Sequence, residues 1–403
     1  MFTTVQARAE PEFLVDGSAG FVVSSIRYAL AGDAEENGAC PGGMTTGYVD
    51  KSQVFVARDG LQLRDGETEA EHLKRLFGVA FGADPVRNLC MNPELGGADA
   101  GFRVVTGENV PVFGIDMDGA VSAIDGQASQ DACPHDDFAG MNGESGIDNQ
   151  YYRVMGCSAQ YQSTGLSNSF EIEMLTGSWG VLITLDGVDD IVNDDEVQVG
   201  IFASADPIAL SSSREPLPYA TYAMHQDPRF QARTRGRISG GVLTTDPVDV
   251  RIEWVVNSIR LDRPLDDARL HLVLDEEGVL DGYLAGYTNV EDLYNYNYSF
   301  RSGTDGTGNL APLRLRAGSA IGKAFVLGYT CEGIYQALYE YADADPDPDT
   351  GRCRAISTQY QISALPAFVV DEATASSNAI LDAAGFGRAD VYDAKPANKT
   401  EGP

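Results

Sequence analysis

The chain has 403 residues, and its 60 acidic residues outnumber its 28 basic ones, which gives a formal net charge of −32. A negative field of this size repels nucleic acids and anionic lipid surfaces, so we expect no nucleic-acid partner. No run of about 18 apolar residues occurs in the sequence, so we expect no membrane insertion. The length is sufficient for two or three domains with hydrophobic cores of their own.

The first part of the chain is predicted to contain two strands and a helix. The expected strands are Gln53–Ala57 and Phe102–Thr106, because both runs are short and rich in valine and phenylalanine. A helix is expected over Thr68–Phe81, where Thr68 and Glu71 have the spacing of a capping box.

The segment Gly114–Cys157 is rich in acidic residues and glycines, and neither Lys nor Arg occurs between Gly114 and Gln150. Carboxylates this close together repel one another unless a cation lies among them. Calcium binds oxygens from carboxylates, carbonyls and water, and a glycine after alternating aspartates allows the turn that points these oxygens inward. We therefore expect calcium as a cofactor, bound by members of the set Asp116, Asp118, Asp125, Asp136, Asp137 and Asp148.

Other interpretations of the acidic segment stay open. It does not fit an EF-hand, because Gly119 comes too early and the twelfth position is Gln127, so a solvated acidic loop is one alternative. His135 directly precedes two of the aspartates, and a His beside acids suits zinc or another transition metal, although a structural His in a turn is the simpler interpretation. The weaker candidates for a second ion are Asp186–Glu196 and Asp343–Gly351.

Strand-like runs separated by turn residues follow the acidic segment. They are Ser169–Leu175, Val181–Leu185, Val197–Ala203, Val248–Leu261, Leu270–Leu274 and Val279–Leu284. From Val248 to Val256 apolar residues alternate strictly with charged ones, which is typical of an antiparallel strand with one buried face. Several such strands predict a mainly β fold, an antiparallel β-sandwich of the jelly-roll type with a few short helices.

One of these runs resembles the catalytic strand of laminarinase-like glycoside hydrolases, which share a jelly-roll fold. The residues that carry the resemblance are Phe170–Met174, where Glu171 matches the first acid of the family motif and Glu173 the middle one. The position of the last acid is occupied by Leu175. Because the retaining mechanism needs two carboxyl groups about 5–5.5 Å apart, this strand alone does not assemble it.

Tyrosines alternate with asparagines shortly before the C-terminal part of the chain. On a strand, Tyr294, Tyr296 and Tyr298 would lie on one face. Tyrosine rings can stack on sugars while asparagine side chains bind sugar hydroxyls, so this run is a candidate ligand-binding face. Packing of the same tyrosines in a core or under a covered edge strand is the alternative.

The C-terminal part mixes helix and strand. Helical spacing of apolar residues lies within Ala317–Ala342, and a strand is expected over Ile356–Val370 with a break at Pro366. A short helix is expected over Thr374–Ala384, followed by a loose tail from Asp390.

The six cysteines are Cys40, Cys90, Cys133, Cys157, Cys331 and Cys353. None forms a C-x-x-C pair, which argues against redox and zinc-ribbon sites. We expect three disulfides between sequence neighbours, namely Cys40–Cys90, Cys133–Cys157 and Cys331–Cys353, with six free thiols in a cytosolic protein as the alternative. Disulfides persist in oxidising compartments, so we expect an extracellular or periplasmic location.

These observations predict three consecutive regions: a mixed region over 1–110, a β-sandwich with acidic loops over 111–300, and an α+β region over 301–403. The function expected is that of a secreted or periplasmic, calcium-stabilised protein that binds a glycan or protein partner at the cell surface without catalysis. A structural subunit of a cell-surface assembly, including an oligomer, is one alternative. A glycoside hydrolase of the jelly-roll type is the other.

Overall fold

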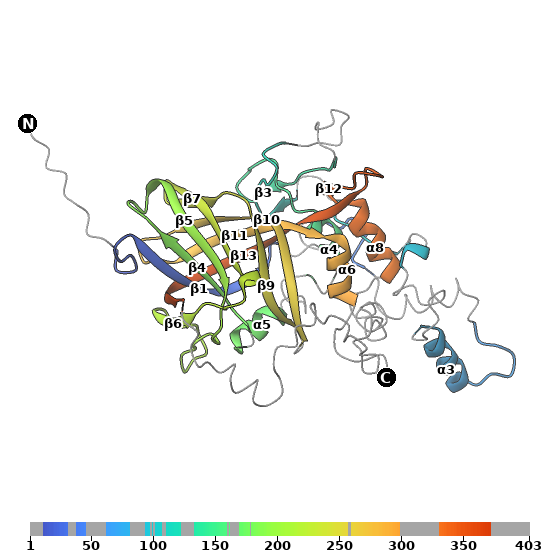
Figure 1. The fold of residues 1–403 in the computed structure, drawn as a ribbon. Coiled ribbons are helices and arrows are strands. Elements are labelled where there is room, and N and C mark those ends of the chain that lie inside the picture. Colours follow the sequence, from blue (N-terminus) through green and yellow to red (C-terminus); the bar gives the residue numbers. More distant parts are fainter. Residues whose placement is uncertain are drawn as a thin grey trace, which may run out of the picture. The chain divides into compact units, whose positions relative to one another are not determined.

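The computed structural model describes residues 11–30, 38–45, 62–80, 93–96, 99, 101–106, 110–121, 133–158, 161, 169–177, 179–256, 259–298 and 330–371. The chain divides into two compact units, each assembled from segments that are distant in sequence (Figure 1). The barrel unit comprises Met1–Ala29, Asn168–Tyr287 and Gln359–Ala383, and the disulfide unit comprises Leu30–Ser167, Thr288–Thr358 and Ala384–Pro403.

The barrel unit is built on a closed antiparallel β-barrel. Its strands are β1 (Ser18–Tyr28), β4 (Val181–Asp186), β5 (Asn193–Ala203), β7 (Gln231–Ser239), β8 (Val242–Thr245), β10 (Ile259–Leu274), β11 (Leu280–Asn289) and β13 (Cys353–Val370). They pair in this order, and β13 pairs back with β1 to close the sheet. Two further strands lie off this path: β9 (Val248–Val256) pairs with β10, and β6 (Ala220–Ala223) pairs with β13 in parallel.

The mainly β, antiparallel prediction is therefore confirmed, but the predicted β-sandwich of the jelly-roll type is wrong. One sheet closes on itself instead of two sheets facing each other. The periodicity along β10 shows why the sequence is ambiguous: Leu272 is fully buried and Leu274 nearly so, whereas Val273 is exposed. Alternation of this kind indicates that each strand has one buried face. This holds for the strands of a sandwich and of a barrel alike.

Most of the predicted strands lie in the barrel, although two of the predictions need correction. Val248–Leu261 is not one strand, because β9 and β10 form a hairpin in which Val256 lies opposite Ile259. The strand Ile356–Val370 is not broken at Pro366, which pairs opposite Phe21 within β13. Pro366 has no N–H to donate to the ladder, but its carbonyl accepts from the backbone N–H of Tyr219 (2.6 Å).

The predicted strand Ser169–Leu175 is instead the helix α5 (Ser169–Leu175). Its side chains Phe170 and Met174 are four residues apart and both buried, which is the spacing of one helical face. The indole Nε1 of Trp179 donates to the carbonyl of Phe170 (3.0 Å) and fixes the end of the helix against the following strand. The barrel unit also contains the short helix η4 (Pro228–Phe230).

The disulfide unit contains short elements only. They are α3 (Glu69–Ala80), η1 (Pro93–Leu95), β2 (Pro111–Val112), β3 (Ala139–Gly140), α4 (Gln150–Met155), α6 (Val290–Tyr298), α8 (Cys331–Glu340) and β12 (Ala344–Pro346). A small apolar core joins the segments around β2, β3 and α4, and it includes Val105, Val112, Phe138, Ile147 and Tyr152.

The helix predicted over Thr68–Phe81 is confirmed by α3, together with its capping box. The Thr68 N–H donates to Glu71 Oε2 (2.9 Å), and the Glu71 N–H donates back to Thr68 Oγ1 (3.4 Å). Phe102–Thr106 is not a strand, because its backbone hydrogen bonds go to single residues such as Arg153 and Ala39 rather than to a ladder. The predictions for Gln53–Ala57, Thr374–Ala384 and the tail lie outside the described residues.

The expected pairing of neighbouring cysteines is wrong. Cys40 bonds to Cys157 over a sequence separation of 117, and Cys133 bonds to Cys353 over a separation of 220. Cys331 is disulfide-bonded as well. Cys90 lies outside the described residues. The pairing follows the fold, because a disulfide needs Cα atoms about 4.4–6.8 Å apart whatever their separation along the chain.

The disulfides indicate an oxidising compartment. Within the part of the chain that the structure describes, no helix has both the length and the apolar character needed to cross a bilayer.

Candidate metal centre

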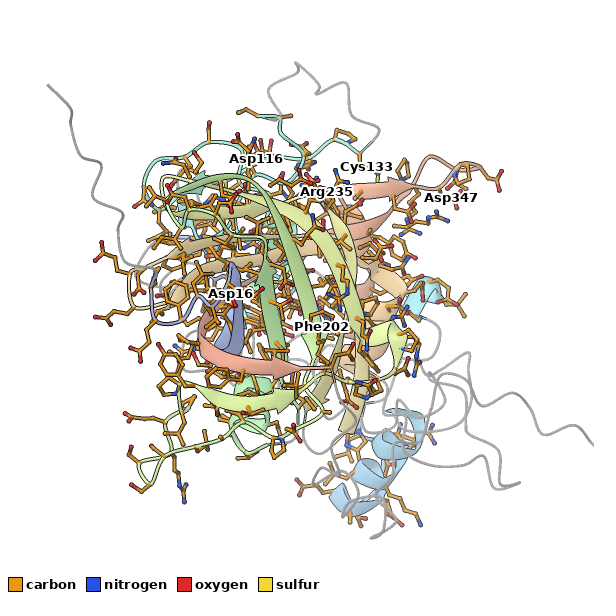
Figure 2. All side chains as sticks on the ribbon, turned by 60° about the vertical axis from the view of Figure 1, so that its left-hand side comes forward. Asp16, Asp116, Cys133, Phe202, Arg235 and Asp347 are labelled. Atoms are coloured by element: carbon orange, nitrogen blue, oxygen red, sulfur yellow. A yellow bond between two sulfur atoms is a disulfide. The ribbon has the colours of Figure 1, made fainter. Side chains whose placement is uncertain are left out.

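The predicted calcium ligands come from three short segments of the disulfide unit. Asp116 and Asp118 lie on the loop after β2 (Figure 2). His135 and Asp137 lie between Cys133 and β3, and Asp148 directly precedes the start of α4.

Buried polar side chains fix the start of α4 and thereby the position of Asp148. Asn149 caps the helix: its side chain accepts from the N–H of Tyr152 (3.3 Å) and donates to the carbonyl of Phe113 (3.1 Å). The backbone N–H of Gln150 donates to Ser357 Oγ (2.8 Å). The chain is thus held on both sides of Asp148 by hydrogen bonds that are shielded from water.

Asp148 is the central acid of the site and is fully buried. Its Oδ2 accepts from the backbone N–H groups of Met117 (2.6 Å) and Asp118 (3.2 Å). Its Oδ1 lies 2.9 Å from Nε2 of His135. One carboxylate therefore ties the Asp116–Asp118 loop to the His135 segment.

His135 has an acidic environment on one side and a carbonyl on the other. Its Nε2 lies 3.3 Å from Asp137 Oδ1 as well as close to Asp148, and its Nδ1 lies 3.0 Å from the carbonyl oxygen of Cys133. Burial alone would lower the pKa of His135, but the hydrogen bonds to Asp137 and Asp148 outweigh burial and raise the pKa to about 11. In the metal-free chain His135 is therefore an imidazolium that compensates part of the acidic charge.

Two tight turns shape the loop after β2. The N–H of Gly119 donates to Asp116 Oδ1 (2.7 Å), and the N–H of Ala120 donates to Asp118 Oδ1 (2.7 Å). Gly146 packs closely against this loop with a positive φ of 81°, and a Cβ there would lie 2.7 Å from the Ala120 carbonyl oxygen and 3.2 Å from Asp116 Oδ2. The close approach requires glycine.

The carboxylates of the site repel one another. Burial raises the pKa of Asp116, and the charges of Asp148, Asp118 and Asp137 raise it further, against a lowering by the hydrogen bond from Gly119. Burial also raises the pKa of Asp148, although the hydrogen bond from His135 lowers it. An added cation would relieve this repulsion.

Asp343 is a member of the site that the sequence did not reveal. It was predicted only as the first residue of Asp343–Gly351, a weaker candidate for a second ion, yet it is buried, and its Oδ1 accepts from the N–H of Ser357 (2.7 Å). Its Oδ2 is buried without a hydrogen-bond partner in the described structure. Burial raises the pKa of Asp343 to about 7, and the positive charge of His135 opposes this rise.

The ligand atoms of Asp118, His135 and Asp148 all lie within 4.8 Å of one another, a spacing compatible with one metal ion. Asp137 lies beside the same imidazole. Carboxylate oxygens suit calcium, whereas an imidazole nitrogen among carboxylates suits zinc and other transition metals. The predicted ligands Asp118, Asp137 and Asp148 thus lie around the histidine, and Asp116 lies within the electrostatic field of these three acids.

Among the described residues, the predicted ligand Asp136 is not one of the side chains grouped around His135. The carbonyl oxygen of Asp136 accepts from Gln150 Nε2 (2.6 Å) and from the Arg153 guanidinium (2.8 Å), so its backbone anchors those side chains. Asp125 lies outside the described residues.

In the two segments that were weaker candidates for an ion, carboxylates interact with neighbouring groups of the chain. In Asp186–Glu196 the Asp194 carboxylate accepts from the backbone N–H groups of Asp189 (2.6 Å) and Glu196 (3.1 Å). In Asp343–Gly351 the side chains of Asp345 and Asp347 each lie 3.1 Å from the guanidinium of Arg354. An arginine therefore supplies the positive charge in the second loop.

The tyrosine run does not form a strand. α6 carries all three tyrosines, and successive even positions on a helix point in different directions, so the argument for a shared strand face is wrong. Tyr294 is fully buried, with its ring edge-on to that of Tyr335 at 5.2 Å between centroids. The side chains of Tyr296 and Tyr298 lie outside the described residues.

The glycosidase-like acids lie on a helix rather than on a strand. Glu171 is buried and forms an ion pair with Arg27 at 3.0 Å, and it accepts hydrogen bonds from Ser25 Oγ and from the N–H of Ile26. This carboxylate is committed to joining α5 to β1. The strand that carries the family resemblance is therefore absent at these residues.

Comparisons of the chain with protein-family models, with curated proteins and with solved structures find no match. Functional inference for this chain therefore depends on the geometry and chemistry of its own residues.

Proposed function

We propose that this chain is a secreted or periplasmic protein whose disulfide unit binds calcium and which engages a glycan or protein partner without catalysis. The observation that carries the proposal is the convergence of Asp118, Asp137 and Asp148 around His135, with Asp116 coupled to the same charges. The barrel supplies a rigid scaffold, and the ion orders the acidic loops of the other unit.

Charge and compartment both support calcium. Burial and, after it, repulsion among the carboxylates raise the pKa of Asp116, and His135 is the imidazole that lies beside Asp137 and Asp148. Disulfides indicate an oxidising compartment, and extracellular calcium modules bind the ion with Kd values of about 10⁻⁴–10⁻³ M. Weak, exposed oxygen ligands such as Asp116 and Asp118 suit that range.

A transition metal such as zinc is the second candidate for the same residues. The contact between His135 Nδ1 and the Cys133 carbonyl (3.0 Å) is the kind of backbone hydrogen bond that orients the imidazole in metal sites. It would leave Nε2 facing Asp148 Oδ1, 2.9 Å away, with Asp118 close by. A metal at this position would replace the proton on Nε2.

Thermal unfolding of the full chain, stripped of metal and titrated with calcium or zinc, tests the proposal. Binding to the folded state alone stabilises it by about 2.7 kcal/mol at a hundredfold excess over Kd. Asp118→Asn keeps an acceptor for the Ala120 N–H and is expected to weaken calcium binding about tenfold. Asp195→Asn, an exposed acid on β5, is the matched control and should leave binding unchanged.

His135→Gln distinguishes the two metals. If calcium is the ligand, the variant retains calcium-dependent stabilisation, because the carboxylates remain. If zinc stabilises the wild type and not this variant, the site is a His-ligated transition-metal centre. No stabilisation by either ion would mean that the cluster is a solvated acidic surface neutralised by His135.

A further inference from the structure

β7 presents a row of arginines on the outside of the barrel. Arg233, Arg235 and Arg237 occupy alternate positions and are exposed, whereas the intervening Ala232 is buried and Ile238 after the row is buried too. Alternate residues of a strand share a face and lie about 7 Å apart. Figure 2 labels Arg235, the middle member of the row.

Among the described residues the arginine row forms no ion pair with an acid, in a chain that has 60 acidic residues. Elsewhere in the described structure arginines pair with carboxylates, as Arg27 does with Glu171 and Arg229 with Asp227. In the row, Arg233 instead lies over the ring of Phe202 (4.8 Å to the centroid). Arg237 donates only to a hydroxyl, Thr244 Oγ1, at 3.4 Å. Asp246 follows β8 opposite Arg235, and its N–H donates to the Arg235 carbonyl (2.8 Å), but its carboxylate forms no ion pair with the row. The three arginines therefore form a local positive patch on a chain whose net charge is −32.

Neutral hydrogen-bonding side chains flank the arginines. The strand register places Thr244 opposite Arg237, His271 opposite Thr244 and Tyr283 opposite His271. Residues directly opposite each other in antiparallel strands point to the same face. Thr244, His271 and Tyr283 therefore form a line across the outer surface of the barrel that begins beside Arg237. On the other side of the row, the exposed Gln198 lies opposite Arg235.

We propose that this surface binds an anionic polysaccharide that carries sulfate or carboxylate groups. The planar guanidinium forms paired hydrogen bonds with such groups. Thr244 beside Arg237 is a hydroxyl partner for the hydroxyls that lie between the charges of a glycan, whereas polyglutamate and duplex DNA present no comparable series of hydroxyls. This proposal specifies the glycan partner of the proposed function. It depends on the presence of such a partner and not on the metal centre.

Direct binding of the full chain to immobilised dextran sulfate and polygalacturonate tests the proposal, with uncharged dextran, polyglutamate and duplex DNA as comparison probes. The wild type is expected to bind at least one of the two anionic polysaccharides at low ionic strength and more weakly at high ionic strength. The variant with Arg233→Gln, Arg235→Gln and Arg237→Gln is expected to lose affinity by about tenfold or more.

The matched control removes the same charge elsewhere. It combines Arg64→Gln, Lys74→Gln and Arg214→Gln, three exposed cations outside β7, and should bind as the wild type does. Equal losses in the two variants would overturn the site and leave only a net-charge effect. No binding to either anionic polysaccharide, or preferred binding of polyglutamate or DNA, would overturn the glycan assignment.

Measuring each binding isotherm with calcium and with a chelator keeps this proposal separate from the metal centre. Polysaccharide binding that depends on the β7 arginines and persists in chelator supports the arginine site even if calcium has no effect on melting. Loss of binding in chelator together with insensitivity to the arginine substitutions would place the partner at the metal centre instead, and would overturn the proposal.

Discussion

The barrel unit and the disulfide unit are stabilised by different kinds of interaction. In the barrel, continuous ladders satisfy the backbone and large apolar side chains such as Phe21, Leu182 and Leu272 are fully buried. The disulfide unit has two-residue strands and short helices, and its buried residues include Asp148 and Gln150. There, disulfides and polar networks supply the order that ladders supply in the barrel.

This difference places the two candidate functions on different kinds of structure. The candidate metal centre lies among loops, where a bound ion would add an interaction that the backbone cannot provide for itself. The arginine row lies on a strand, where the pleat fixes the spacing of its members. We therefore expect metal to change the stability of its unit, and substitutions of the β7 arginines to change binding with little change in stability.

The largest effect is expected from removal of the disulfide that closes the longest loop. In the double variant Cys133→Ala/Cys353→Ala the loop of 220 residues is no longer closed. Closing a loop of about 100 residues is worth about 4.7 kcal/mol, so a loss of about 5 kcal/mol is expected in the disulfide unit. Amide hydrogen exchange should show reduced protection in α4 and α8 while β4 and β5 stay protected.

Uniform loss of protection in both units would contradict the comparison, because it would mean that the units unfold as one. The wild type without reductant is the reference for exchange in the barrel. The same double variant should also bind calcium more weakly, since Cys133 anchors the segment that carries His135 and Asp137.

A cavity-forming substitution in the barrel core tests the stability of the other unit. Leu272→Ala removes a fully buried side chain of β10 and is expected to cost about 2–5 kcal/mol of unfolding free energy. Val273→Ala, on the same strand and about half exposed (51%), is the matched control and should change stability by about 0.5 kcal/mol or less. Chemical denaturation measures both, and similar costs for the two variants would contradict the assignment of the barrel interior.

Local signals in the sequence predicted single elements but not their assembly. The capping box of Thr68 and Glu71 located a helix, because both partners lie within one turn. Ser169–Leu175 was ambiguous between strand and helix, since Phe170 and Met174 fit a helical face only once their burial is known. Closure of the barrel by β1 and β13 joins the two ends of the described chain, and no short-range pattern encodes it.

The metal centre could be predicted in part for the same reason. Acid density pointed to Asp116, Asp118, Asp137 and Asp148, which lie on one stretch of sequence. Asp343 could not be assigned, because only the fold brings it from the start of β12 into the field of His135. The cysteine pairing failed similarly: spacing along the chain favours neighbours, while the bonds follow distances between Cα atoms of 5.7 and 5.8 Å.

The smallest effect is expected from alanine substitutions at two glycines near the metal centre. Comparing the two variants separates the cost of backbone strain from that of steric contact. Gly146 and Gly143 both have positive φ, 81° and 87°, so alanine at either costs about 1–2 kcal/mol. At Gly143 no atom lies within 4 Å of the added Cβ, whereas at Gly146 the Cβ would meet the Ala120 carbonyl oxygen at 2.7 Å and Asp116 Oδ2 at 3.2 Å.

Gly146→Ala should therefore shift the Asp116–Asp118 loop, while Gly143→Ala should not. Both variants are expected to lose similar backbone stability in chelator, with a further loss in Gly146→Ala. The stabilisation gained on adding calcium should be smaller in Gly146→Ala than in Gly143→Ala, because only the former displaces ligand oxygens. Differential melting with and without calcium measures this difference. Equal calcium responses in the two variants would show that the Asp116–Asp118 loop, which packs against Gly146, does not bind the ion. Asp137 and Asp148 would then remain as the candidate ligands.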